Sequence, residues 1–416
     1  MTASPPPASP ASAPGRHLPA LLIVVAGCAI AMLTFGPRSV FGLFLVPMSR
    51  EFGWGRDVFG LAVAIQNLLW GLGSPFAGAI ADRFGTVRVM WAGALIYAAG
   101  LVLMAYSGTP TALQLTAGVL VGFGLSAASF NLVLAAFGKL LPDRLKALGF
   151  GAATAAGSFG QFLFPPLTTG LLQSVGWQDT LIVFGASLLL VMPFSLALAT
   201  RGAAPASGPA APQQSVGAAL SEAFRHPSYV MLVLGFFTCG FQLAFVTVHM
   251  PAFLVDRGMS LSVGAVTLAL IGLFNMAGSI GAGYLTGRVS RKWLLAWIYA
   301  GRGVAIAVFI LLPVTPLSCY VFGAVIGLLW LSTVPPTSSL VMLMFGTRYM
   351  AMLYGFAFFS HQVGGFIGVY LGGEIYEAVG SYDLVWWLAV ALSFASAAIN
   401  LPIREEPARS PVAAVV

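Results

Sequence analysis

The sequence predicts an all-α membrane protein with twelve transmembrane helices in two six-helix repeats. The composition is the first observation behind this prediction: 59% of the 416 residues are hydrophobic, 7% are charged and the mean hydropathy is +0.93. A soluble protein needs a far more charged surface. The second observation is that apolar segments of about 20 residues, long enough to cross a hydrocarbon core of about 30 Å, recur along the whole chain. The third is an internal repeat.

Twelve apolar segments are separated by short links that contain charged residues, glycine or proline. We place the spans near 18–48, 57–81, 88–107, 110–138, 147–174, 179–200, 228–253, 261–286, 292–312, 316–343, 349–374 and 383–402. Six precede and six follow a linker of small residues and proline at 201–227. The chain is therefore expected to divide into an N-terminal bundle, 18–200, and a C-terminal bundle, 228–402.

The two ends of the chain are expected to be cytoplasmic tails. Residues 1–17 are rich in Pro, Ala and Ser and lack a basic start followed by a short apolar core, so they predict a disordered tail rather than a signal peptide. Residues 403–416 form the second predicted tail.

The halves resemble one another at an offset of about 205 residues, which indicates duplication. The segment "GLGSPFAGAIADRFG" (71–85) matches "MAGSIGAGYLTGRVS" (276–290), and 158–179 matches 362–383. The fold is therefore expected to be two copies of one six-helix unit.

Basic residues are scattered one to three at a time in the links, so the net charge of +7 indicates membrane topology rather than nucleic-acid binding. With both termini inside, fourteen of the nineteen Lys and Arg residues fall on the cytoplasmic side, as the positive-inside rule requires. We expect a multi-pass protein of the plasma membrane, which is the inner membrane in a Gram-negative bacterium. The three cysteines all lie in predicted spans and are odd in number, which argues against a disulfide framework.

One link carries a recognisable motif. In "GAIADRFGTVR" (78–88) the pattern G-x3-D-R-x-G-x2-R resembles the loop signature of the major facilitator superfamily. That resemblance implies a central cavity between the halves and transport by alternating access. Glycines in such a link let helices approach closely, and charges at the helix ends can pair across the cytoplasmic face to hold one state. The expected gating residues are Gly78, Asp82, Arg83, Gly85, Arg88 and, in the second copy, Arg288.

A finer resemblance is to the monocarboxylate transporters and their oxalate/formate antiporter relatives. "FGPRSVFGLFL" (35–45) is similar to the first-helix pattern of that group, which implies a role for Arg38 in proton and substrate handling. In the eighth span, "IGLFNMAGS" (271–279) resembles the stretch where many of those transporters carry an acid and an arginine that grips the carboxylate. Here those positions hold Asn275 and Ser279.

Three charged or titratable residues lie deep in predicted spans. A cation at mid-bilayer depth costs about 2.5 to 3.5 kcal/mol on insertion scales, so Arg38 is a candidate for substrate binding or proton coupling, with carbonyl capping as the alternative. His361 is the best-placed proton carrier because histidine changes charge near neutral pH; a hydrogen-bonded packing role is the alternative. Arg302 is expected to be either a direct ligand or a residue that supports the site from behind.

Uncharged polar residues complete the candidate site. Repeat pairing puts Gln242 opposite Pro37, so we expect Gln242 and Arg38 to line the cavity together. A helix-to-helix hydrogen bond is the alternative for any single amide. The remaining candidates for substrate binding are Gln66, Asn131, Gln161, Asn275 and Tyr354.

These residues favour a secondary transporter of a small, monocarboxylate-like organic anion, with protons as a candidate co-substrate. A carrier of a larger neutral or aromatic metabolite, in uptake or drug efflux, is the alternative, and a sensor or assembly subunit of the same fold is a third. The sequence has no ATP-binding loop and no histidine, cysteine and carboxylate cluster with metal-ligand spacing. We therefore expect no enzyme activity, cofactor, metal or nucleic-acid partner, and a monomer in the lipid bilayer.

Overall fold

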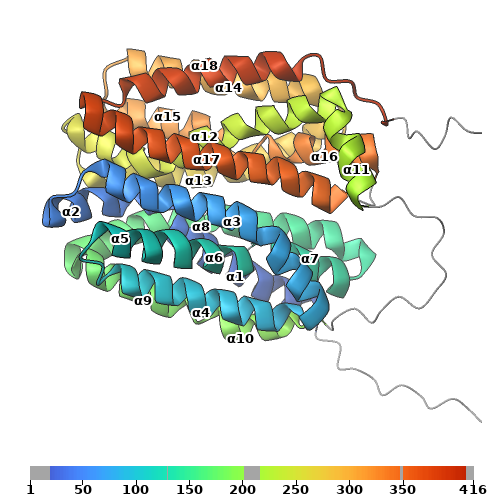
Figure 1. Ribbon diagram of the computed structural model, residues 1–416, viewed down its shortest axis with the longest axis horizontal. Coiled ribbons are helices and arrows are strands. Elements are labelled where there is room, and N and C mark those ends of the chain that lie inside the picture. The colour runs from blue at the N-terminus through green and yellow to red at the C-terminus, as the bar shows by residue number, and fades with distance from the viewer. Residues whose placement is uncertain (1–18, 129, 201–215, 347–349, 409–416) are drawn as a thin grey trace, which may run out of the picture.

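The computed structural model describes residues 19–128, 130–200, 216–346 and 350–408. Within these ranges the regular structure is entirely helical. The predicted N-terminal tail, residues 201–215 of the linker and residues 409–416 lie outside the described part of the chain. The two halves form two layers of roughly parallel rods, with the first half below and the second above in Figure 1.

The first half contains six helical rods, several of which are segmented. In chain order its elements are α1 (Ala20–Arg38), α2 (Gly42–Phe52), α3 (Arg56–Phe84), α4 (Thr86–Met104), α5 (Pro110–Leu113), the π-helix η1 (Gln114–Leu120), α6 (Val121–Ala127), α7 (Phe130–Leu140), α8 (Asp143–Ser174), α9 (Gly176–Leu188), α10 (Val191–Ser195) and the 3-10 helix η2 (Leu196–Leu198).

The second half begins with a short helix and continues with six rods. Its elements are α11 (Val216–Arg225), α12 (Pro227–Asp256), α13 (Leu261–Thr286), α14 (Arg291–Leu311), α15 (Pro316–Leu329), α16 (Val334–Phe345), α17 (Met350–Val379) and α18 (Asp383–Asn400).

Ten of the rods in the described ranges are long and apolar enough to cross a membrane, by length and composition. The membrane prediction is thereby confirmed, although this criterion does not extend to the full count of twelve. The two rods outside the set are α8 and α17, which have 32 and 30 residues. Both carry polar side chains and glycines at mid-length, Ser158 and Gln161 on α8 and His361 and Gln362 on α17, which lower their mean hydropathy.

Among the described residues, the first, sixth and tenth rods, which the sequence predicts as continuous, are interrupted, and the breaks in the first and the tenth bear on the site. The first is interrupted at 39–41, between α1 and α2, just after Pro37. The tenth is interrupted at 330–333, between α15 and α16, and α16 begins with two prolines. Proline removes a backbone N–H from the helical ladder, and the freed carbonyls must find other partners inside the membrane. Both breaks border the interface between the halves.

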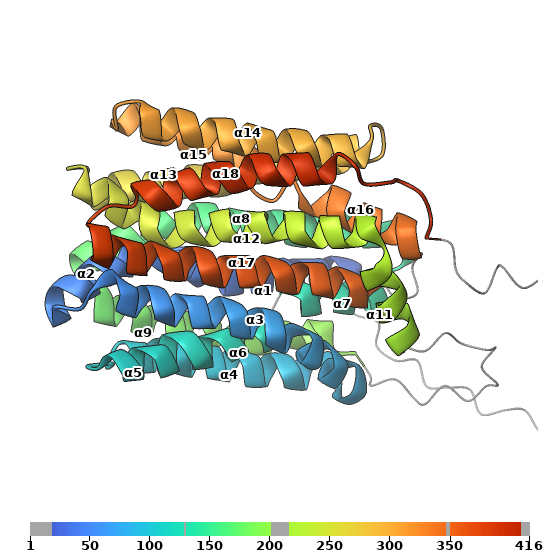
Figure 2. The ribbon, with the colours of Figure 1, turned by 45° about the horizontal axis from the view of Figure 1, so that its top comes forward.

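The halves meet along α3 and α17, α8 and α13, and α2 and α12; Figure 2 shows α17 lying between α12 and α3. Glycines allow the closest approaches. A Cβ at Gly42 would lie 2.3 Å from the carbonyl oxygen of Thr247, and one at Gly272 would lie 2.6 Å from the carbonyl carbon of Gln161. A larger side chain at either position would separate the layers.

The two ends of the bundle are named here by their residues. The closed face carries the end of α2, Arg56, Asp256 and Tyr382, and lies at the left in Figure 1. The open face carries the links at 85, 141–142 and 287–290, together with α11 at the right. Residues 403–408 pack on the open face: Ile403 is buried, and the backbone N–H of Ala408 donates to the carbonyl of Met344 at 2.8 Å.

Candidate functional site

A cavity of about 530 Å³ lies between the two halves. Its lining runs from Phe35 and Thr247 at mid-span to Gly283, Tyr284 and Ser338 near the open face, and Tyr284 is 62% exposed. The walls come from both halves and are mostly apolar and aromatic. Among the described lining residues there is no Asp or Glu. The volume is in the range of sites that hold small organic molecules.

Arg38 supplies the positive charge of this cavity. It is the last residue of α1, directly before the break, so the C-terminal end of the helix dipole favours its charge. One guanidinium nitrogen donates to the amide oxygen of Asn67, and the guanidinium carbon lies 4.6 Å from the centre of the Trp70 ring. The Nε of Arg38 is buried and has no hydrogen-bond partner among the described residues.

The surroundings of Arg38 are therefore neutral. An amide and an indole ring orient the guanidinium but do not neutralise it. A half-buried guanidinium whose Nε is buried without a partner, and which has no acid beside it, is left short of negative charge. This arrangement suits an anion that arrives with a ligand.

His361 also lines the cavity, as predicted. Its Nδ1 lies 3.0 Å from Oε1 of Gln362, and its ring stacks on Phe358 with centroids 5.8 Å apart. The Nε2 of Gln362 is buried without a hydrogen-bond partner among the described residues. Two polar side chains of the lining thus come from α17, one of them with an unpartnered Nε2, and Arg38 comes from the opposite half.

Of the remaining candidates, Asn131, Gln161 and Tyr354 line the cavity. Asn275 does not. Its Nδ2 donates to Ser158 Oγ at 3.0 Å and to Gln161 Oε1 at 3.3 Å, while its Oδ1 accepts from the Leu331 backbone N–H at 3.1 Å. It also accepts from the Ser279 hydroxyl. Asn275 is fully buried and all its hydrogen-bonding groups are used, so it joins the halves and holds the break after α15.

The expectation that Gln242 lines the cavity with Arg38 is wrong. Gln242 is 1% exposed and its amide nitrogen donates to the carbonyl of Ala389 at 2.9 Å, on the side away from the cavity. Gln66 is corrected in the same way: it is fully buried and donates to the carbonyl of Ala117 at 2.9 Å. Both amides make helix-to-helix hydrogen bonds, the alternative that the sequence left open.

Arg302 lies behind the cavity wall and is fully buried. Its Nε donates to the carbonyl of Leu329 at 3.0 Å, its Nη2 to the same carbonyl at 2.6 Å and to that of Trp330, and its Nη1 to Gln242 at 3.4 Å. Arg302 thus caps the C-terminal end of α15 at the break in the tenth rod. It touches the backbone of Trp330, which lines the cavity, but is not a lining residue itself.

Asn67 and Trp70 are site residues that sequence reasoning missed. Both line the cavity on α3, and both contact Arg38. They are separated by three positions, so they share one face of the helix. Gln66 precedes Asn67 by one residue, which turns its side chain by about 100° around the helix axis and away from the cavity. From the sequence, the wrong one of two adjacent amides was therefore chosen.

The comparisons with known proteins identify the family. Residues 27–369 match the model described as Major Facilitator Superfamily. The chain belongs to the major facilitator superfamily. It is 26% identical over 380 residues to the uncharacterised MFS-type transporter YcxA of Bacillus subtilis, covering 90% of this chain and 92% of that protein. It is 25% identical over 400 residues to monocarboxylate transporter 13 of Rattus norvegicus, covering 92% and 88%.

The likeness to solved structures concerns the fold. The crystal structure of a D-xylose-proton symporter superposes with a TM-score of 0.74 at 15% identity, covering 93% of this chain and 98% of that one. The superfamily prediction is confirmed, and monocarboxylate transporters are among the relatives at low identity. The protein is a membrane transporter of this superfamily and not an enzyme.

The superfamily motif lies at the open face, and its charges do not link the two halves in this conformation of the described residues. Asp82 pairs with Lys139 of the same half at 2.5 Å, while Arg83 and Arg288 lie over the rings of Phe84 and Tyr284.

The glycines of the motif have different surroundings. Gly85 has a φ of 90°, which requires glycine, and a Cβ there would lie 2.8 Å from the carbonyl oxygen of Thr200. At Gly78 a Cβ would meet open space, so the expected close helix contact is not made. Arg88 is exposed. The face that bears the motif is thus the one on which the cavity lining ends.

Proposed function

We propose that this protein moves a small organic anion across the membrane by secondary active transport, and that Arg38 binds the anionic group. The observation that supports this is the single strong charge of the cavity. Arg38 is half-buried with a fully buried Nε, is hydrogen-bonded to a neutral amide, and faces a lining without acids in the described part of the chain. A carboxylate would supply the missing negative charge and pair with the unpaired guanidinium edge.

The orientation belongs to the same proposal. The open face carries the basic links, so the positive-inside rule puts it and both termini in the cytoplasm. The closed face would then face outward, and the conformation described here would be the inward-facing state of an alternating-access cycle. His361 and Gln362, opposite Arg38, are proposed as the neutral partners of the substrate, with His361 able to take up a coupled proton.

Uptake of radiolabelled carboxylates into proteoliposomes tests the role of Arg38. Arg38→Gln keeps a long polar side chain and removes the charge. Losing one partner of a buried charge pair costs about 2 kcal/mol or more, so uptake should fall roughly 30-fold or more. Arg50→Gln removes a cation from an exposed position on α2 and should leave uptake unchanged. Normal uptake by correctly inserted Arg38→Gln protein would refute the proposed role.

A neutral or aromatic substrate is the second candidate, and the walls of the cavity favour it. Phe35, Trp70, Phe236, Trp330 and Phe358 all line the cavity, and position 279 offers a hydroxyl rather than a second cation. Aromatic faces can hold a flat ring system without any charge. Thermal stabilisation of the purified protein separates the candidates, because a ligand of the folded state raises its apparent stability. A shift with carboxylates that Arg38→Gln abolishes supports the anion carrier, whereas a shift with neutral aromatics alone supports the second candidate.

A further inference from the structure

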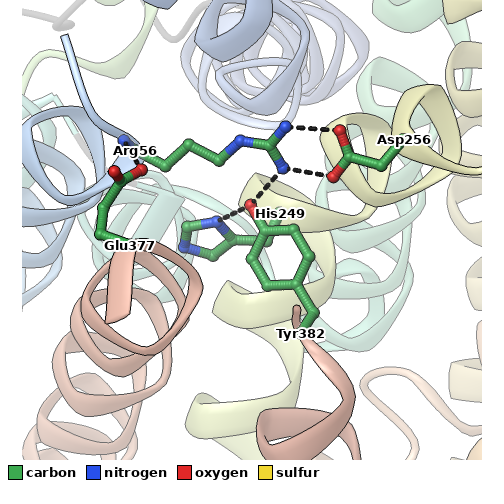
Figure 3. Close-up of polar contacts among 5 residues, drawn as sticks. All are labelled: Arg56, His249, Asp256, Glu377 and Tyr382. Atoms are coloured by element: carbon green, nitrogen blue, oxygen red, sulfur yellow. Dashed lines mark hydrogen bonds and ion pairs between the residues drawn. The ribbon is translucent and has the colours of Figure 1, made fainter. Parts of the chain in front are cut away.

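A polar network joins the two halves at the closed face, away from the cavity. Arg56, the first residue of α3, makes two hydrogen bonds to the carboxylate of Asp256 at the end of α12, at 2.6 and 2.7 Å. Its backbone N–H donates to Glu377 of α17 at 2.8 Å. Figure 3 shows Arg56 reaching across from the first half to these two acids of the second.

Aromatic rings complete the surroundings of this guanidinium. Its carbon lies 3.8 Å from the centre of the Tyr376 ring, and its Nη1 donates to the Tyr382 hydroxyl at 3.0 Å. Bidentate pairing together with stacking makes arginine hard to replace at such a site. The side chain of Arg56 is 13% exposed and that of Asp256 is 30% exposed, so solvent on this side reaches the carboxylate end of the ion pair.

His249 lies directly behind Tyr382 and is fully buried. Its Nε2 is 2.8 Å from the carbonyl oxygen of Val369, and its Nδ1 is 3.1 Å from the Tyr382 hydroxyl oxygen. A carbonyl can only accept, so Nε2 carries the hydrogen and Nδ1 of the neutral ring accepts one from Tyr382. The tyrosine hydroxyl thus accepts from Arg56 and donates to His249, and it connects the histidine to the ion pair (Figure 3).

The packing around the imidazole leaves it little freedom. A Cβ at Gly372 of α17 would lie 2.4 Å from Cδ2 of His249, and one at Gly60 of α3 would lie 3.7 Å from Cε1. The ring therefore touches both halves where they meet. The ionisable groups on the elements packed at this face are Arg50 and Glu51 on α2, Arg56 and Asp57 on α3, Asp256 on α12 and Arg257 after it, Tyr370, Glu374, Tyr376 and Glu377 on α17, Tyr382 before α18 and Asp383 on α18.

We propose that Nδ1 of His249 is a proton-binding site that opens the closed face. A proton on Nδ1 turns this atom from acceptor to donor, so the Tyr382 hydroxyl loses the group to which it gives its hydrogen. It also creates a second cation next to Arg56, since the nitrogen atoms of both lie within 3.1 Å of one hydroxyl oxygen. Both effects disfavour the closed arrangement, and separating the halves relieves them by admitting water.

For transport, the consequence is that a low pH on the side of the closed face favours opening of the protein toward that side. The proton comes from solution on the side of the closed face and leaves no covalent change. Binding of one proton shifts an opening equilibrium by at most about tenfold per pH unit. This inference goes beyond the proposed function, because it concerns the gate rather than the substrate, and its test uses no substrate.

Hydrogen exchange of the full-length protein in lipid nanodiscs, at pH 7.5 and pH 5.5, tests the proposal. Exchange rates are corrected for the intrinsic effect of pH on amide chemistry and followed in peptides that cover 56–64, 246–258 and 369–383. The unmodified protein should exchange severalfold faster in these peptides at pH 5.5. His249→Gln, which keeps a polar side chain but cannot bind the proton, should show equal corrected rates at both pH values.

Three further variants make the result specific. Tyr382→Phe removes only the connecting hydroxyl. It should weaken the pH response, because the donor conflict is lost while the repulsion between the protonated His249 and Arg56 remains, and Arg56 and Asp256 should stay paired. Asp256→Asn should exchange fast at both pH values, because the ion pair is lost. His226→Gln, at the opposite end of α12, is the matched control and should respond to acid like the unmodified protein.

The possible outcomes divide clearly. An acid response that disappears in His249→Gln and is reduced in Tyr382→Phe supports the proposal. A full response in either variant means that the proton acts elsewhere at this face, and the proposal is overturned. The absence of any acid response in the unmodified protein overturns it as well.

Discussion

Arg38 and Arg302 are both cations inside the membrane-spanning part of the protein, and each lies beside a break in a helical rod. Arg302 is fully buried and donates to the carbonyls of Leu329 and Trp330 and to Gln242. Arg38 makes a side-chain hydrogen bond to Asn67 and keeps an unpaired Nε. From the sequence the two look alike, whereas in the structure their hydrogen-bonding capacity is met to very different degrees.

The difference indicates how to separate a structural from a functional buried charge. The carbonyls freed by a helix break need donors, and Arg302 spends most of its N–H groups on them and on Gln242. Arg38 is held in place by its neighbours but is not satisfied by them, so its remaining capacity is available to a ligand. Substitutions at Arg302 should therefore alter mainly stability, whereas substitutions at Arg38 and its partner Asn67 should alter mainly transport.

The largest expected effect on stability comes from Arg302→Gln. This change removes four hydrogen bonds, leaves the Leu329 carbonyl without its side-chain donor and leaves the Trp330 carbonyl with only the weak Cys239 thiol contact, which should cost about 3 kcal/mol or more. The apparent melting temperature of the purified protein should fall by several degrees, and Arg302→Lys should give an intermediate value because one ammonium cannot match the fork of the guanidinium. An unchanged melting temperature would remove the basis for treating Arg302 as a cap.

Arg38→Gln should behave in the opposite way when its stability is measured. The native guanidinium is underpaired, so its loss forfeits only one hydrogen bond, to Asn67, worth about 0.5 to 1.5 kcal/mol, and the contact with Trp70, worth about 0.5 to 2 kcal/mol. Its melting temperature should stay close to that of the unmodified protein while carboxylate uptake is lost. A collapse in stability comparable to that of Arg302→Gln would show that both arginines are structural.

Asn67→Asp makes Arg38 resemble Arg302. The new carboxylate stands where the amide oxygen now accepts from the guanidinium, and it supplies the negative charge that we assign to the substrate. We expect uptake to fall about tenfold or more, the effect of at least 1.4 kcal/mol of competition, with stability unchanged or increased. Asn67→Ala is the control for loss of the amide and should weaken uptake less. If Asn67→Asp transports normally, Arg38 is not the anion site.

Much of the fold follows from the sequence because the rules that determine it are one-dimensional. Hydropathy and segment length indicate the spans, and the repeat between 71–85 and 276–290 indicates two units. The helix breaks were not predicted. Pro37 signals that a backbone bond is lost, but whether a helix bends or ends there depends on the partners that its carbonyls find, such as Arg302 at the other break.

The candidate site was predicted less completely, because depth can be read from a sequence and rotation about the helix axis cannot. Arg38 and His361 were selected by depth and charge, and both line the cavity. Gln66, Gln242 and Asn275 lie at suitable depth but point toward neighbouring helices. One residue along from Gln66, Asn67 faces the cavity, since a single step turns a helix by about 100°.

The smallest expected effect extends the comparison to an anion, Glu405, whose charge is well satisfied by the protein. It accepts from the Ser290 hydroxyl at 2.5 Å, from the Lys292 backbone N–H at 2.9 Å and from Arg291 at 3.4 Å. Partial burial alone would raise the pKa of Glu405, but these hydrogen bonds lower the pKa on balance. A group whose pKa is lower in the folded state stabilises the protein above its unfolded pKa, and this contribution is lost as the pH falls through the folded pKa.

Glu405→Gln should therefore lower the free energy of unfolding at neutral pH by less than about 1 kcal/mol, because the ion pair is partly exposed. The apparent melting temperature should fall slightly as a result. The difference from the unmodified protein should shrink below about pH 4, where the unmodified carboxyl is also being protonated. Carboxylate uptake should not change, since Glu405 packs at the start of α14 on the open face and does not line the cavity. If the difference in melting temperature between Glu405→Gln and the unmodified protein stays constant from pH 7 to pH 3.5, the charge of Glu405 does not stabilise the fold. A fully hydrogen-bonded ion would then not by itself indicate a structural role.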